Sequence, residues 1–164
     1  MKHVSITVIA ILILNSTILF LSSCKIQEQK AVNELHGMVA HNIDSLYQQT
    51  GEPFLRLIEK GDSITLRNHF LQCRNLYKQI ELAVEYFMPG TAKAINGAAL
   101  PEVEVEENKE NEPTGLQVVE TFLYPEYNTT NKEEFIRAVK NLHASVYRAN
   151  QIWEVTNPTE KQWI

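Results

Sequence analysis

The chain has 164 residues and a formal net charge of −5, with 20 Asp and Glu against 15 Lys and Arg. An acidic surface disfavours binding to nucleic acid and electrostatic adhesion to anionic lipid, because both of these carry negative charge. The two cysteines are too few for a cysteine metal cluster, and no C-x-x-C-H motif is present for covalent attachment of haem.

The first residues have the pattern of a bacterial lipoprotein signal. Lys2 precedes an uncharged, mostly apolar run, and small residues lead into Cys24. In such signals the chain is cut before the cysteine, which then carries lipid. An uncleaved membrane-spanning helix is the alternative, since the run is long enough for one. We expect residues 1–23 to be the signal and residues 24–29 a leader that lipid on Cys24 anchors in the bacterial cell envelope, facing the periplasm.

Helical patterns fill the next part of the chain. From residue 26 to about residue 49 the sequence is a polar leader that runs into a first predicted helix. A helix of one or two turns is predicted after the Gly51-Glu52-Pro53 break. A long helix is then predicted with Asp62 or Ser63 as its N-cap and Pro89-Gly90 as its end. Its apolar seam repeats at alternating spacings of 4 and 3 residues, at Leu66, Phe70, Cys73, Tyr77, Ile80, Val84 and Phe87.

An acidic stretch follows the long helix. Thr91 to Ile95 are expected to form one helical turn, and Pro101 to Pro113 enclose six glutamates and a single Lys109. Like charges resist compact packing, so the sequence predicts a solvated acidic loop. A docking surface for a basic partner is the alternative; a calcium site lacks the ligand spacing of an EF-hand loop. The six residues are Glu102, Glu104, Glu106, Glu107, Glu110 and Glu112.

Two further helices complete the predicted fold. Thr114 is expected to cap a helix that ends at Tyr124-Pro125, and Thr130-Asn131 to open a capping box before a last helix that ends near Pro158. The fold class is therefore all-α, an up-and-down bundle of about four main helices over residues 30–157 with a long acidic loop. Residues 158–164 are expected to be a tail that links to a further C-terminal domain.

One motif, at the start of the helix predicted after Thr114, resembles a family signature. Gly115-Leu116-Gln117-Val118-Val119-Glu120 is similar to the G-x-H-x-x-E motif of imelysin-like proteins, which are periplasmic helical lipoproteins linked to iron uptake. In that motif the histidine and the glutamate share one helical face and can reach one metal. Here Gln117 replaces the histidine, and an amide is a poorer ligand for a transition metal.

A longer stretch, from about Phe70 to Trp153, resembles the N-terminal helical region of bacterial lipoproteins classed as di-haem cytochrome c peroxidases. The resemblance includes TAKAINGAALPEVEVEEN and EPTGLQVVETFLYP. It implies that haem c belongs to a catalytic part with two C-x-x-C-H sites, which this sequence does not contain, and that this chain holds no cofactor itself. Non-covalent haem on His143 or Met88 is conceivable, but a lone histidine near an apolar stripe is more typical of packing.

These observations predict a non-catalytic, lipid-anchored, periplasmic helical module that positions a redox domain or partner near the membrane. No catalytic residue and no metal ligand set is predicted. The acidic glutamates are the expected contact for a basic electron carrier. The alternative is an imelysin-like protein that binds iron or another metal, with Gln117 and Glu120 lining an inter-helix site.

Overall fold

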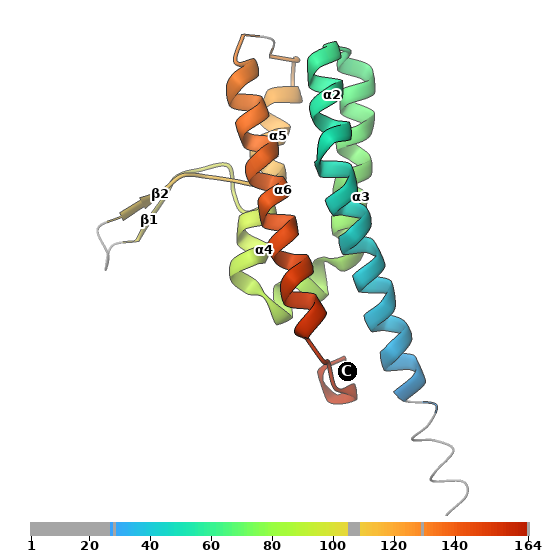
Figure 1. Ribbon diagram of the computed structural model, residues 1–164. Coiled ribbons are helices and arrows are strands. Elements are labelled where there is room, and N and C mark those ends of the chain that lie inside the picture. Colours follow the sequence, from blue (N-terminus) through green and yellow to red (C-terminus); the bar gives the residue numbers. More distant parts are fainter. Residues whose placement is uncertain (1–26, 28, 105–108, 129, 164) are drawn as a thin grey trace, which may run out of the picture. The chain divides into compact units, whose positions relative to one another are not determined.

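The computed structural model describes residues 27, 29–104, 109–128 and 130–163 (Figure 1). The chain divides into a main unit, Met38–Thr156, and a second unit made of the residues before and after it. The predicted signal and lipidation site, residues 1–23 and Cys24, lie outside the described residues, as do Glu106 and Glu107.

The described residues of both units are mostly helical. The first helix covers residues 29–50 and is followed by α2 (Glu52–Lys60), α3 (Ser63–Phe87), α4 (Pro89–Asn96), α5 (Leu116–Leu123) and α6 (Lys132–Val155). A short 3-10 helix, η1 (Glu160–Gln162), belongs to the second unit. The prediction of a helical fold is confirmed. Among the described residues, no helix combines the length and the apolar character needed to cross a membrane.

The long helix α3 follows the predicted seam. Asp62 is its N-cap, and its side chain accepts a hydrogen bond from the Ile64 backbone N–H at 3.1 Å. Burial raises the pKa of the Cys73 thiol to about 12, which agrees with the predicted packing role, because a reactive cysteine needs a lowered pKa. The fully buried seam residues are Leu66, Phe70, Cys73, Tyr77, Ile80 and Val84.

The structure differs from the prediction at Pro89. We expected Pro89 and Gly90 to end the long helix and one helical turn to follow. The long helix does end there, at Phe87 with Met88 as its C-cap, but Pro89 is the first residue of the eight-residue helix α4. Proline suits the first turn of a helix, because the N–H that it lacks would have no intrahelical acceptor there. The chain therefore continues into a helix that contacts α3, α5 and α6.

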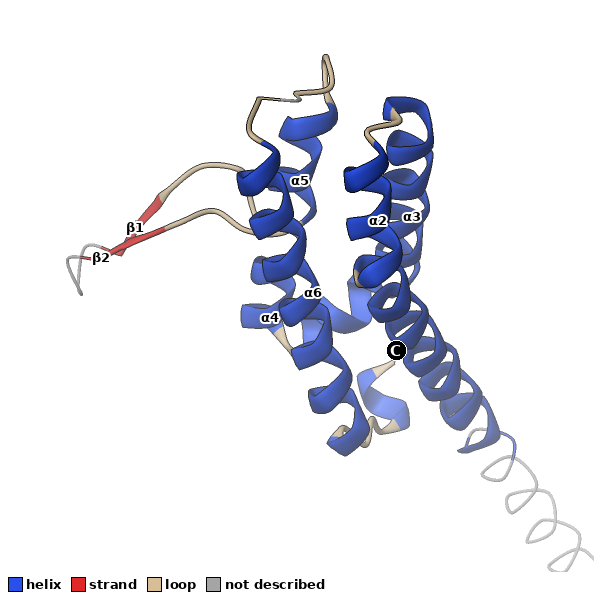
Figure 2. Cartoon of the chain, turned by 45° about the horizontal axis from the view of Figure 1, so that its top comes forward, coloured by secondary structure: helices blue, strands red, loops and turns tan. Residues whose placement is uncertain are grey.

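The acidic stretch also differs from the predicted loop. Strands β1 (Glu102–Glu104) and β2 (Lys109–Asn111) pair antiparallel, with Val103 opposite Glu110 in the register. The β-branched Val103 favours extended backbone in β1. Figures 1 and 2 both show the two strands extending away from the helices.

Two predicted helix caps are not formed. Gly115, not Thr114, is the N-cap of α5. Asn131 precedes α6 without a side-chain cap hydrogen bond, so the predicted capping box is wrong. The Asn128 side chain instead accepts the Thr130 backbone N–H at 2.9 Å, which turns the chain before α6.

Aromatic rings fill the core around α6, which contacts α2, α4 and α5. The buried Phe135 ring stacks on Phe122 with 5.1 Å between the ring centroids. Phe54 of α2 meets Phe135 edge-on at 6.1 Å. Trp153, also buried, meets Phe87 of α3 in the same manner at 5.6 Å. These contacts fix α6 against α2, α3 and α5.

Two histidines contact the last residues of the first helix, just before the chain turns into α2. His69 of α3 is buried, and its Nε2 lies 2.8 Å from the Gln49 carbonyl oxygen. His143 of α6 stacks on Tyr47, and its Nδ1 lies 3.2 Å from the Thr50 hydroxyl oxygen. The break is therefore pinned to both long helices, and His143 has a packing role.

We predict that His143 makes stability depend on pH. Burial lowers the pKa of His143 in the folded state, partly opposed by a backbone hydrogen bond with Tyr47. The unfolded chain therefore takes up this proton at a higher pH than the folded chain does. The free energy of unfolding then decreases as the pH falls from about 6.5, the ordinary histidine pKa, through the lower pKa of His143 in the folded state. Urea unfolding across this window should show a weaker pH dependence in His143→Gln than in the wild type. His41→Gln, at an exposed position, is the control and should keep the wild-type pH dependence. If the free energy of unfolding of His143→Gln changes with pH as steeply as that of the wild type, the prediction is wrong.

Candidate functional site

The junction of α4 and α5 depends on close backbone approach at Gly115. Its φ angle is +97°, a conformation that side chains disfavour. A Cβ atom there would lie 2.3 Å from the Ile95 carbonyl oxygen and 2.8 Å from that of Ala94. Only glycine therefore lets the start of α5 meet the last turn of α4.

Two side chains beside Gly115 satisfy carbonyl groups at the end of α4. The last carbonyls of a helix have no partner within it. The Thr114 hydroxyl donates to the Ala94 carbonyl oxygen at 3.1 Å, and the Gln117 amide donates to that of Asn96 at 3.0 Å. Residues 114–117 thus cap α4.

Two arginines of α3 hold the rest of α5. The Arg74 guanidinium donates to the Glu120 carboxylate at 2.8 Å. Arg67 donates to the carbonyl oxygen of Leu123, the last residue of α5, at 3.0 Å, and to that of Pro125, beyond the helix, at 3.1 Å. Its guanidinium also lies over the Tyr124 ring, 4.9 Å from the centroid. Because these side chains are partly exposed, the contacts orient α5 more than they stabilise it.

The predicted motif residues therefore have separate partners. Gln117 contacts α4 and Glu120 contacts α3, so the structure does not bring them together as a ligand pair. A metal ion at Glu120 would compete with the Arg74 guanidinium for the carboxylate. In the part of the chain that the structure describes, no three His, Cys, Asp or Glu side chains group closely enough to hold a metal ion.

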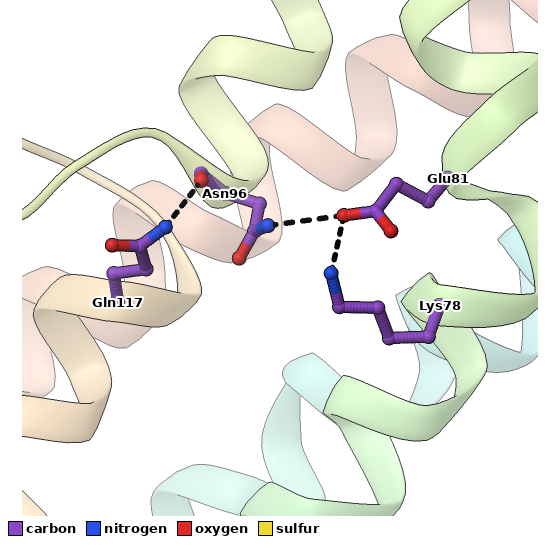
Figure 3. Close-up of polar contacts among 4 residues, drawn as sticks. All are labelled: Lys78, Glu81, Asn96 and Gln117. Carbon is purple, nitrogen blue, oxygen red and sulfur yellow. Dashed lines mark hydrogen bonds and ion pairs between the residues drawn. The ribbon is translucent and has the colours of Figure 1, made fainter.

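A chain of polar contacts connects α3, α4 and α5 (Figure 3). Glu81 accepts hydrogen bonds from Lys78 and from the Asn96 side-chain amide, the latter at 3.3 Å. The Asn96 backbone carbonyl accepts from Gln117. Asn96 is thus the link between the capped end of α4 and the carboxylate on α3.

A cleft of about 290 Å³ opens beside this chain of contacts, between α3 and α4. Tyr77 is one of the residues that line this cleft. Its hydroxyl is buried and has no hydrogen-bond partner among the described residues. Burial, followed by the charges of Glu81 and Glu85, raises the pKa of Tyr77, so the phenol stays protonated. The cleft is also lined by Glu85, Pro89, Ala92, Lys93, Asn96 and Gly97.

The sequence did not identify Tyr77, Arg67, Arg74 or Asn96 as site residues. Arg74 and Glu120 are 46 positions apart, so no local spacing relates them. Tyr77 is one apolar seam position among several. Among the predicted contact glutamates, Glu102, Glu104 and Glu110 lie in the two strands, and Glu112 follows β2 and is exposed. Glu106 and Glu107 lie outside the described residues.

No protein-family model matches the chain, and neither a curated protein nor a solved structure matches it. A function for this chain must therefore be inferred from the geometry of the described residues.

We predict that Gly115→Ala separates α5 from α4. The methyl group adds backbone strain at positive φ and overlaps the Ile95 carbonyl, and together these should lower the free energy of unfolding by about 2–4 kcal/mol. Urea denaturation measures the loss. Gly90→Ala is the matched control, because a Cβ there meets nothing within 4 Å. If Gly115→Ala and Gly90→Ala have the same free energy of unfolding, the close approach of Gly115 to the Ile95 carbonyl does not constrain the fold.

Proposed function

We propose that this chain is a non-catalytic helical module, lipid-anchored through Cys24 on the periplasmic side of the bacterial cell envelope, which positions a redox domain or partner. In this proposal residues 30–157 form an up-and-down bundle of the kind that precedes the haem-carrying part of di-haem cytochrome c peroxidases. Haem c would be carried by that other part, and this chain would supply a rigid spacer and a docking surface.

The use of the motif residues is the observation that carries this proposal. Gly115, Gln117 and Glu120 each contact a neighbouring helix. Side chains engaged in this way hold a short helix in place, which supports a role as a scaffold. A role in iron or metal acquisition receives less support, because Arg74 occupies the Glu120 carboxylate.

The acidic ribbon is the part of the module that we propose contacts a basic partner. Its glutamates are concentrated between Pro101 and Pro113. The strands, which carry three of the six, extend away from the helices (Figure 2). Charge presented on a projecting element attracts an oppositely charged protein over a distance of about 10 Å, the Debye length at moderate salt. The partner would be an electron carrier with a basic surface, such as a basic c-type cytochrome.

We predict that the ribbon glutamates govern this binding. Replacing Glu102, Glu104, Glu106, Glu107, Glu110 and Glu112 with glutamine should weaken the binding of a basic c-type cytochrome at low ionic strength by about tenfold or more. The wild-type affinity should fall as salt rises, because salt screens the attraction. Surface plasmon resonance across a salt series measures both effects.

The control removes the same amount of charge elsewhere. It replaces six exposed glutamates with glutamine, at Glu52, Glu59, Glu126, Glu133, Glu134 and Glu154. If the ribbon is the contact, this variant keeps most of the affinity although its net charge is the same. Equal loss in both variants would show that net charge alone attracts the carrier, and unchanged affinity in the ribbon variant would exclude the ribbon.

We further predict that Cys24 is the lipid attachment site. In a bacterial host, labelled fatty acid should be incorporated into the wild type and into Cys73→Ala, whose thiol is buried, but not into Cys24→Ala. Mass spectrometry of the membrane-extracted chain should find residues 1–23 removed. A chain that retains residues 1–23 and carries no lipid would refute the anchor.

A further inference from the structure

We propose that the outer face of α3 binds the same face of a second copy of this chain, with the two helices antiparallel. This inference goes beyond the scaffold role and does not depend on it. It concerns a surface made by α3 alone, in the main unit, and not the acidic ribbon.

The outer face is a second periodic face of α3, on the side away from the buried seam. Each of its residues stands two positions before a seam residue, and two positions turn an α-helix by about 200°. The outer face therefore repeats at the same alternating spacings of 4 and 3 residues, the pattern by which one helix packs along another. Its residues are all exposed: Ile64, Asn68, Leu71, Asn75, Lys78, Leu82 and Glu85.

Large apolar side chains on this face are exposed to water. Ile64 is 71% exposed, Leu71 42% and Leu82 79%. Tyr86, which flanks the face at its end, is 60% exposed. A single exposed apolar residue is ordinary, but several aligned along about 33 Å of one helix, at about 1.5 Å per residue, indicate an interaction surface.

The order of the apolar residues along the outer face fits an antiparallel copy. When Leu71 lies opposite Leu82 of the second copy, Ile64 lies within one turn of Tyr86 of that copy. The two-fold axis of such a pair repeats each contact on its other side. Apolar residues therefore meet apolar residues in both halves of the interface.

The polar residues select the direction of the pair. In the same register Lys78 lies opposite Asn75 of the second copy, and Glu85 lies opposite Asn68 of the second copy. A side-chain amide accepts from an ammonium group and donates to a carboxylate, so both contacts are complementary. A parallel pair would instead bring Lys78 of both copies together and Glu85 of both copies together. Like charges that face each other across an interface oppose binding.

The charge of the outer face selects a second copy as the occupant. The chain has a net charge of −5, but this face carries one Lys and one Glu, so two copies do not repel each other across it. A strongly basic or strongly acidic partner would find no matching field here. One helix face buries less than the about 1,600 Å² of a standard interface, so we expect a dissociation constant in the micromolar range or weaker.

The test is disulfide trapping of the full-length chain in a bacterial host. Two differently tagged copies are expressed together, one with Leu71→Cys and the other with Leu82→Cys, both with Cys73→Ala. Oxidation with copper phenanthroline should join the two tags, because these positions lie opposite each other. Disulfides between identical tags should be at least about fivefold fewer, since equivalent positions are about 16 Å apart along the helix axis. The chain without an introduced cysteine reports any disulfide through Cys24.

Leu100→Cys with Val155→Cys is the matched control. These two apolar residues are 69% and 77% exposed but lie outside α3, and their pair should give no product above background. Disulfides between identical tags in place of mixed ones would show a parallel pair and overturn the proposal. A mixed product no more abundant than that of the control pair would overturn it as well.

A charge exchange separates specific pairing from loss of folding. Leu71→Lys or Leu82→Glu alone should weaken self-association by about tenfold or more, because each places a charge against an apolar side chain. Both substitutions in one chain should restore the affinity to within about threefold of the wild type, since the antiparallel register sets each new charge against its opposite. Sedimentation velocity of the detergent-extracted chain measures the affinity. A double variant that associates no more tightly than the single variants would refute the register.

Discussion

The close approach of Gly115 to the last turn of α4 is the constraint on which the rest of the main unit depends. It places the start of α5 against the Ile95 carbonyl group, where no side chain fits. Thr114 and Gln117 then come within hydrogen-bond distance of two further α4 carbonyls. One residue without a side chain thus allows two short helices, each with unpaired ends, to satisfy part of each other's backbone requirement.

Polar contacts add to the apolar packing of α5, whose buried residues are Leu116, Val119 and Leu123. Arg74 of α3 binds the Glu120 carboxylate, and Arg67 of α3 binds the carbonyl groups of Leu123 and Pro125. A helix of eight residues is marginal by itself, so its contacts with neighbouring helices hold it in place. The directional hydrogen bonds to charged groups add specificity to its apolar packing. A motif that resembles a metal site in another family serves here to join three helices.

The Tyr77 cleft contrasts with this junction. At the junction, carbonyl, amide and carboxylate groups are matched within the chain, whereas the Tyr77 hydroxyl is buried without a partner among the described residues. Asn96 belongs to both places, because its carbonyl is capped by Gln117 and its amide contacts Glu81. The capped end of α4 therefore holds Asn96 at the cleft. Changes at Gly115 should disturb the cleft as well as α5, and Tyr77→Phe should not disturb α5.

The sequence alone determined the helical fold, the extent of α3 with its Asp62 cap, and the burial of Cys73, because apolar periodicity and short capping side chains act within a few residues. It did not determine that Pro89 starts a helix or that Val103 lies in a strand, since both depend on what the neighbouring segment does. The partners of Glu120 and Gln117, and the isolation of the Tyr77 hydroxyl, were decided only by the tertiary structure. These contacts join residues that are tens of positions apart, such as Arg74 and Glu120, and no local pattern encodes which distant side chains folding brings together.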